Sequence, residues 1–303
     1  MPLDPPVNAS SIPPVTQATF AIGDERTASR IVDAITESYP SHDLAIAAFE
    51  APGGRWDITM HFGEPPDEDF IRSLVTDAAG AAAAGSIVFG AVETKDWVKA
   101  SLADLVPVSA GRFIVHGSHD RDRVPPNKLG IEIEAALAFG TGHHGTTRGC
   151  LLLLDQVLNQ RTPKRVLDLG SGTGVLAIAA AKALRRRVLA TDIDFRSVIV
   201  AGENAHLNGV GTLVEAVHAT GFHAPDFAAN GPFGLVMANI LANPLRRLAP
   251  DMARHLAPRA FVILSGLLPH QANSVVAAYR GAGLKLLKRI QIDGWSSLLM
   301  QRR

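Results

Sequence analysis

Val166-Leu-Asp-Leu-Gly-Ser-Gly-Thr-Gly174 is followed directly by the apolar, alanine-rich run 175–184. Residues 166–169 predict a buried strand, the glycines predict a tight turn, and the alanine-rich run predicts a helix packed back on the strand. Glycines suit this turn because a backbone that bends sharply while it approaches a ligand leaves no room for side chains. The start of the helix then offers free N–H groups to a polar or anionic ligand.

The spacing of the glycines decides between ligands. A dinucleotide fingerprint, Gly-x-Gly-x-x-Gly, needs its third glycine where this chain has Val175, which argues against NAD. A second predicted strand, 188–191, leads into Asp192, about 20 residues downstream of the turn, where a carboxylate can accept hydrogen bonds from both ribose hydroxyls. The two elements together predict a nucleoside site.

The second half of the chain predicts a parallel sheet. Strands are expected at 165–169, 188–191, 212–217, 233–238 and 260–264, with helical segments between them. Such alternation requires right-handed crossovers with helices on both faces, and ligands then bind at the carboxyl ends of the strands. A closing hairpin is expected at 284–292 and 295–301, around the turn Asp293-Gly294.

The first half predicts a small α+β domain of the ferredoxin-like type. The order is strand, helix, strand, strand, helix, strand, at 18–22, 24–39, 44–50, 56–62, 66–79 and 86–92. We therefore expect four parts: a proline-rich tail over 1–17, the ferredoxin-like domain over 18–95, a connecting segment over 96–130 with a helix at 96–105, and the larger α/β domain over 131–303.

Composition limits the partners and the compartment. The 29 basic and 29 acidic residues cancel, so no global field favours nucleic acid or an anionic membrane, although a local patch at Arg185-Arg186-Arg187 is compatible with this balance. One cysteine, Cys150, excludes an intramolecular disulfide and fits a reducing compartment. The N-terminus lacks the features of a signal peptide, and the weakly polar run 78–92 is too short to span a bilayer. These features predict a cytoplasmic protein.

The segment 137–147 contains three glycines and predicts a flexible loop, with Thr146 or Thr147 as cap of an apolar helix over 148–158. His143 and His144 do not predict a metal site, because adjacent side chains point in different directions and no cysteine or carboxylate cluster lies nearby. For Cys150 we expect a buried helical residue rather than a nucleophile.

Three segments carry a resemblance to a known family: Asp168 to Gly174 with the acid at 192, Ala138 to Thr147, and Met237-Ala-Asn-Ile-Leu-Ala242. Together they resemble the ribosomal protein methyltransferase family that modifies large-subunit ribosomal protein eleven, within the class I S-adenosylmethionine-dependent methyltransferases. The resemblance covers nearly the whole chain after the tail.

The resemblance implies fold, activity and site. It implies a Rossmann-like domain of seven strands, mostly parallel, and a first domain that recognises the protein substrate. It implies N-methylation of lysine side chains of that ribosomal protein, with an α-amino group as a second acceptor. The cofactor would be S-adenosylmethionine, without metal, membrane or direct nucleic-acid binding. The cofactor-binding residues implied are Thr147, Gly170, Gly172, Asp192 and Asn239.

Asn239 is the expected catalytic residue, because it follows the fourth strand of the sheet. An asparagine there can accept a hydrogen bond from an amine and direct the nitrogen lone pair at the sulfonium methyl, as in the Asn-Pro-Pro motifs of other amino methyltransferases. Ile240 and Leu241 replace the prolines here, which argues against a planar amide or nucleobase and leaves room for a flexible amine. The alternative is an ordinary residue at a strand end.

Two other functions share these motifs. An RNA or small-molecule methyltransferase would use the same cofactor residues, and for RNA a basic face is expected. A non-catalytic interaction protein would retain the fold but bind no cofactor. No residue in the sequence is assigned as general base, although a lysine nucleophile, with a pKa near 10.4, must lose its proton.

Overall fold

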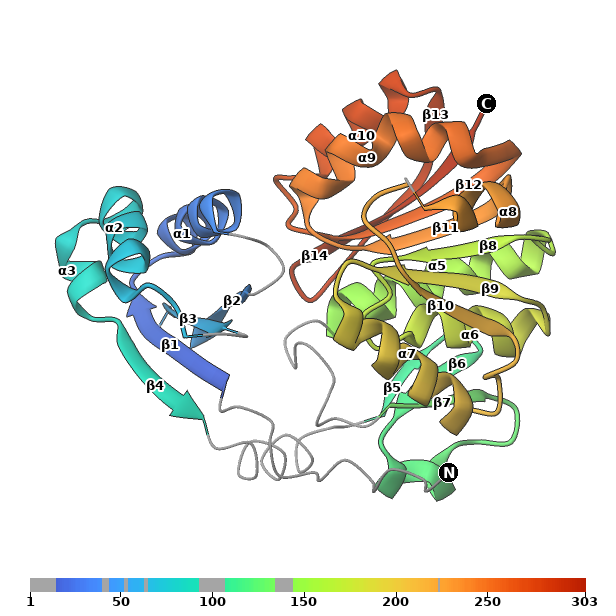
Figure 1. Ribbon diagram of the computed structural model, residues 1–303, viewed down its shortest axis with the longest axis horizontal. Coiled ribbons are helices and arrows are strands. Elements are labelled where there is room, and N and C mark those ends of the chain that lie inside the picture. The colour runs from blue at the N-terminus through green and yellow to red at the C-terminus, as the bar shows by residue number, and fades with distance from the viewer. Residues whose placement is uncertain are drawn as a thin grey trace, which may run out of the picture. The chain divides into compact units, whose positions relative to one another are not determined.

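The computed structural model describes residues 15–39, 44–51, 54–62, 65–92, 107–133, 144–222 and 224–303. The chain divides into two compact units, Met1–Ala100 and Ser101–Arg303, each with hydrophobic clusters of its own (Figure 1). The predicted helix 96–105 and most of the predicted loop 137–147, His143 included, lie outside the described residues. No helix within the described ranges is long and apolar enough to span a bilayer.

The first unit is an antiparallel sheet with strand order β2-β3-β1-β4, and this topology confirms the ferredoxin-like prediction. Alternate sheet residues, among them Phe20, Ile58 and Met60, form one buried cluster with the apolar faces of α1 and α2. Its elements are β1 (Val15–Ile22), α1 (Glu25–Ser38), β2 (Leu44–Ala51), β3 (Arg55–Phe62), α2 (Glu68–Ala79), α3 (Ala81–Gly85) and β4 (Val88–Val92).

The helix starts agree with the sequence, and the first strand is longer than predicted. Asp24 and Asp67 cap α1 and α2 by accepting hydrogen bonds from the N–H groups of Thr27 and Phe70, at 2.9 and 3.0 Å. Strand β1 begins at Val15, so the last three residues of the expected tail belong to the sheet. These three residues belong to the strand because residues 15–17 pair with β4 and residues 16–17 also pair with β3.

The second unit contains a seven-stranded sheet of order β10-β9-β8-β11-β12-β14-β13 (Figure 1). The first five strands in this order are parallel, and β13 and β14 form the expected antiparallel hairpin. The predicted seven-stranded, mostly parallel sheet is therefore confirmed. Its strands are β8 (Val166–Leu169), β9 (Val188–Asp192), β10 (Val214–His218), β11 (Phe233–Asn239), β12 (Leu256–Leu267), β13 (Leu284–Ile292) and β14 (Trp295–Arg302).

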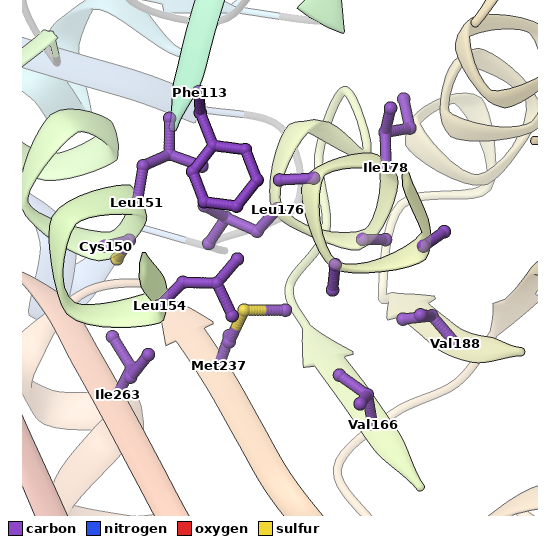
Figure 2. Packing of buried hydrophobic residues seen from close by; sticks show 14 of the residues in the cluster. Phe113, Cys150, Leu151, Leu154, Val166, Leu176, Ile178, Val188, Met237 and Ile263 are labelled. Carbon is purple, nitrogen blue, oxygen red and sulfur yellow. The ribbon is translucent and has the colours of Figure 1, made fainter. Parts of the chain in front are cut away.

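Helices cover both faces of this sheet. On one face, α5 and α6 pack on Val166, Val188, Met237 and Ile263, as Figure 2 shows. On the other face, the alternate strand residues, such as Leu167 and Val236, join the buried side chains of α8 to α10. The helices are α5 (His144–Gln160), α6 (Val175–Leu184), α7 (Phe195–Leu207), α8 (Pro225–Asn230), α9 (Ala242–His255) and α10 (Ala272–Gly281).

A smaller three-stranded sheet precedes the main one in sequence, with the order β5-β6-β7. Strands β5 and β6 are antiparallel, whereas β6 and β7 are parallel. Its elements are β5 (Val108–Ala110), β6 (Phe113–His116), the 3₁₀ helix η1 (Ser118–Arg123) and β7 (Leu129–Glu132). Phe113 joins the cluster on α5 and α6, which attaches this sheet to the larger one (Figure 2).

The start of α5 corrects one prediction. The helix begins at His144, so Thr146 and Thr147 lie in its first turn, and neither caps a helix that starts at 148. Thr146 is instead buried and hydrogen-bonded to residues of β11 and β12. A partner far away in the sequence therefore replaces the local capping role.

Gly174, the last glycine of the turn, packs closely against Ala201 of α7. Its φ is 79°, and a Cβ there would lie 3.0 Å from the Cβ and 3.1 Å from the Cα of Ala201. Gly174→Ala should lower the free energy of unfolding by about 2–5 kcal/mol, through a strained φ and an overpacked contact. Gly209→Ala is the control, because Gly209 also has a positive φ but faces open space, and it should cost about 1–2 kcal/mol. Urea unfolding followed by circular dichroism measures both, and equal losses would contradict the packing argument.

Candidate functional site

The site lies where three neighbouring strands end at the same level. Leu169 of β8 pairs with Thr191 of β9 and with Ala238 of β11. The next residues along each strand, Gly170, Asp192 and Asn239, therefore come together at the carboxyl edge of the sheet. The structure thus gathers four of the five predicted site residues, Gly170, Gly172, Asp192 and Asn239, around one sheet edge.

The backbone N–H groups of the glycine turn hold it against the end of β9. The N–H groups of Gly170 and Ser171 donate to the Thr191 carbonyl, at 2.8 and 3.0 Å. The N–H of Gly172 donates to Oδ2 of Asp192 at 2.8 Å, and the N–H of Asp194 donates to Oδ1 at 3.0 Å. The carboxylate is therefore fixed by two backbone donors, and each of its oxygens still has a lone pair for a ligand hydroxyl.

Asp168 ties the strand before the turn to the helix after it. Its Oδ2 accepts from the N–H of Ala177 in the first turn of α6, at 2.9 Å. Burial raises the pKa of this carboxyl to about 7, the negative charge of Asp192 adds to the increase, and the Ala177 hydrogen bond opposes it. A carboxyl whose pKa is close to neutral pH thus lies next to the turn.

Three buried polar atoms around the turn have no partner within the described part of the chain: Oδ1 of Asp168, Oγ of Ser171 and Oγ1 of Thr191. Buried polar atoms are normally hydrogen-bonded, so unpaired ones beside a turn are consistent with a missing polar ligand. Gly172 adds an opening, because a Cβ built there meets no atom within 4 Å. These features suit a ligand that lies on the turn and carries hydroxyl or amino groups.

Asn239 is held by its amide nitrogen. Nδ2 donates to Oγ1 of Thr146 at 3.2 Å, which leaves Oδ1 as the atom that can accept from a ligand. The next residue, Ile240, packs between Gly170 and Gly266: a Cβ at Gly170 would lie 2.3 Å from its Cγ2, and one at Gly266 would lie 2.5 Å from its carbonyl oxygen. Both glycines are therefore required for the backbone that carries Asn239.

The sequence did not reveal the residues that support Asn239. Oγ of Ser265 lies 3.3 Å from the Thr146 carbonyl, to which it donates, and 2.7 Å from Oγ of Ser297 on β14. The side chains of Thr146, Ser265 and Ser297 are all buried. The one available signal was Ser265-Gly266 at the carboxyl end of the fifth parallel strand. Thr147, the fifth predicted site residue, is half-buried next to Thr146 on α5.

The sequence has two other features that could carry chemistry, the adjacent histidines 143 and 144 and the single cysteine, Cys150. Among the described residues, no group of three or more histidine, cysteine, aspartate or glutamate side chains is arranged to hold a metal ion. Cys150 is buried on α5, and burial raises the pKa of its thiol to about 12. A thiol that remains protonated and inaccessible is a core residue, as expected, and not a nucleophile.

The chain was compared with known families and structures. The family model described as "Ribosomal protein L11 methyltransferase (PrmA)" matches residues 32–303. A ribosomal protein L11 methyltransferase of Rhodopseudomonas palustris (strain BisB5) is 67% identical over 287 residues, which cover 95% of this chain and 97% of that protein. The corresponding protein of Bradyrhizobium diazoefficiens is 65% identical over 289 residues, which cover 95% of this chain and 98% of that protein.

A solved structure agrees with the sequence matches. The crystal structure of a ribosomal protein L11 methylase from Lactobacillus delbrueckii subsp. bulgaricus is similar with a TM-score of 0.59 and 30% sequence identity, covering 66% of this chain and 100% of that chain. A family model that spans most of the chain, and relatives with about two thirds of their residues identical, lead to one conclusion: this chain belongs to the ribosomal protein L11 methyltransferase family.

Proposed function

We propose that the enzyme transfers methyl groups from S-adenosylmethionine to lysine side-chain amines of ribosomal protein L11, with the α-amino group as a second acceptor, in the cytoplasm. The observation that carries this proposal is the meeting of the glycine turn, Asp192 and Asn239 at one edge of the sheet. The proposed nucleoside contact on β9 and the proposed amine contact on β11 then lie at one edge of the sheet with only β8 between them, as a one-step transfer requires.

The residues at this edge fit the parts of the cofactor. The Asp192 carboxylate, already oriented by two backbone N–H groups, is suited to accept from the two ribose hydroxyls. Gly170 and Gly172 let the ligand approach the backbone, and the unpaired oxygens of Asp168 and Ser171 offer partners for its polar groups. Thr147 is the proposed contact for the methionine portion.

S-adenosylmethionine supplies a methyl group on a positively charged sulfur. When the methyl-to-sulfur bond breaks, the sulfur leaves as a neutral thioether, so the chain contributes mainly the positioning of the reactants. Oδ1 of Asn239 accepts from an N–H of the incoming amine and thereby turns the nitrogen lone pair toward the methyl. The amine must be neutral to react, and removal from water into the site lowers the pKa of a lysine. Ile240 and Leu241 stand where planar-substrate motifs have prolines, which suits a flexible side chain.

A direct assay tests the proposal. The full chain is incubated with isotopically labelled S-adenosylmethionine and purified L11, in parallel with RNA, and the products are analysed by mass spectrometry. Label on lysine residues of L11 is expected. Label on the RNA alone, or on neither acceptor, would contradict the proposed acceptor.

Asp192→Ala should weaken S-adenosylmethionine binding by about 1.5–3 kcal/mol, or roughly 10- to 150-fold, because charge-assisted hydrogen bonds to the ribose are lost. Titration calorimetry measures the dissociation constant. Asp194→Ala is the matched control, because Asp194 caps α7 two residues away, so its loss should lower stability more than affinity. An unchanged dissociation constant for Asp192→Ala would rule out the ribose assignment.

Asn239→Ala should lower kcat more than cofactor affinity, because its proposed partner is the amine in the transition state. Thr146→Val should have the same pattern with a smaller loss, since it removes the acceptor that orients the amide, whereas Thr146→Ser keeps the hydroxyl and should retain most of the turnover. Steady-state kinetics and calorimetry on the same preparations separate the two effects. Equal losses of kcat and affinity would make Asn239 a cofactor contact only.

We propose that the first unit presents L11 to the second, because every cofactor-type residue lies after residue 130. A fragment from Ser101 to Arg303 contains two of the three hydrophobic clusters complete and should fold. It should bind S-adenosylmethionine with nearly normal affinity, and its methylation of L11 should fall by orders of magnitude because proximity is lost. Both quantities are measured on one purified fragment. Full activity on L11 would refute a recognition role for the first unit.

A further inference from the structure

The amino-terminal edge of the seven-stranded sheet, opposite the site, is lined with cations. The pairing of Val166 with Val188 places Arg165 and Arg187, which precede them, side by side on neighbouring strands. Arg187 is the last of three consecutive exposed arginines, 185–187. Arg302 of β14 follows Gln301, which pairs with Phe261 of β12, so it belongs to the same edge of the sheet.

A groove of about 600 Å³ runs along this edge, and four cationic residues line it: Arg161, Lys164, Arg165 and Arg259. All four are exposed. No carboxylate lines the groove, and its remaining surface is formed by small residues, prolines and Phe261, over which the Arg161 guanidinium lies at 5.8 Å from the ring centroid. We call these four residues the basic groove and 185–187 the arginine run.

The cations of this edge differ from a group of arginines of the same unit that are neutralised by carboxylates. Four arginines elsewhere in it form ion pairs: Arg112 with Asp155, Arg121 with Glu132, Arg123 with Asp120, and Arg254 with Asp251. Within the described ranges, no ion pair involves a side chain of the basic groove or the arginine run. Like charges so close together repel one another, and a polyanion would neutralise them.

Two of these cations also occupy strained backbone positions. Arg185 and Arg259 have φ values of 50° and 57°, in the left-handed region that favours glycine. Arg185 adopts this conformation as the C-cap of α6, where helices commonly end in the left-handed region, whereas Arg259 adopts it within β12. A cationic side chain is therefore present at two positions where glycine would relieve the strain.

We propose that the basic groove and the arginine run bind the phosphate backbone of RNA. An extended row that crosses several strands fits successive phosphates rather than one small anion. A membrane surface is less suitable, because none of the large apolar side chains exposed in the described chain lines the groove. The zero net charge predicts no global attraction to RNA, but it averages over a chain whose charges are unevenly placed.

The position of this surface separates it from the methyl acceptor site. Parallel strands place their amino and carboxyl ends at opposite edges, so RNA bound here leaves Asn239 and the glycine turn accessible. The surface is therefore an RNA docking surface and not the binding site of an RNA substrate. A ribosomal protein is assembled onto RNA, so such a surface would keep the enzyme near its substrate.

The test is binding of a short fluorescein-labelled single-stranded RNA to the full chain, followed by fluorescence anisotropy at several salt concentrations. With four to seven phosphates in contact, one for each cation engaged, log K should fall against log salt with a slope of about −3 to −5. Arg165→Glu with Arg259→Glu should weaken binding at least tenfold and flatten the slope. The control, Lys288→Glu with Arg289→Glu, changes the net charge equally on exposed positions of β13, outside the basic groove and outside the first unit, and should alter binding less than threefold.

Three results would overturn the proposal: no RNA binding by the native chain at low salt, equal losses in the two double variants, or tighter binding to phosphatidylglycerol vesicles than to RNA. Cofactor calorimetry and methylation of purified L11 on every variant show that the site remains folded. If the native chain fails to methylate L11, the proposed function fails, whatever the RNA result.

Discussion

The hydrogen bonds between the glycine turn and the end of β9 are the constraint on which the rest of the structure depends. The Thr191 carbonyl accepts from Gly170 and Ser171, and the Asp192 carboxylate accepts from Gly172. The same residues therefore fix the turn, orient the carboxylate and set the start of α6. Because backbone groups make most of these bonds, the proposed cofactor side of the site is a consequence of the parallel pairing of β8 with β9.

The acceptor side is organised differently, by buried side chains. Asn239 donates to Thr146, Ser265 donates to the Thr146 carbonyl, and Ser265 also bonds Ser297. Buried polar groups are costly unless they are paired, so this line of partners favours one arrangement of α5, β12 and β14 around Asn239. The closing hairpin therefore supports the proposed catalytic residue, in addition to completing the sheet.

The two edges of the sheet have opposite characters. The carboxyl edge holds Asp168, Asp192 and the unpaired oxygens of the turn, whereas the amino edge holds the basic groove. A five-residue strand separates them by roughly 16 Å. Parallel strands make this separation automatic, because all of their carboxyl ends lie on one side. The proposed cofactor and the proposed RNA would therefore bind without competition.

The sequence by itself determined the strands, helices and turns that depend on residues close together in the chain. Periodicity predicted the ferredoxin-like order and the parallel sheet. The spacing from Gly170 to Asp192 predicted the nucleoside site, since these two residues belong to one strand-helix-strand unit. Tertiary structure alone decided the start of α5, the role of Thr146 and the line of cations at the opposite edge. Thr146 meets Asn239 across 93 positions of sequence, and Arg165 meets Arg187 only through strand register. Contacts of this kind depend on how separate elements pack, and no local pattern encodes them.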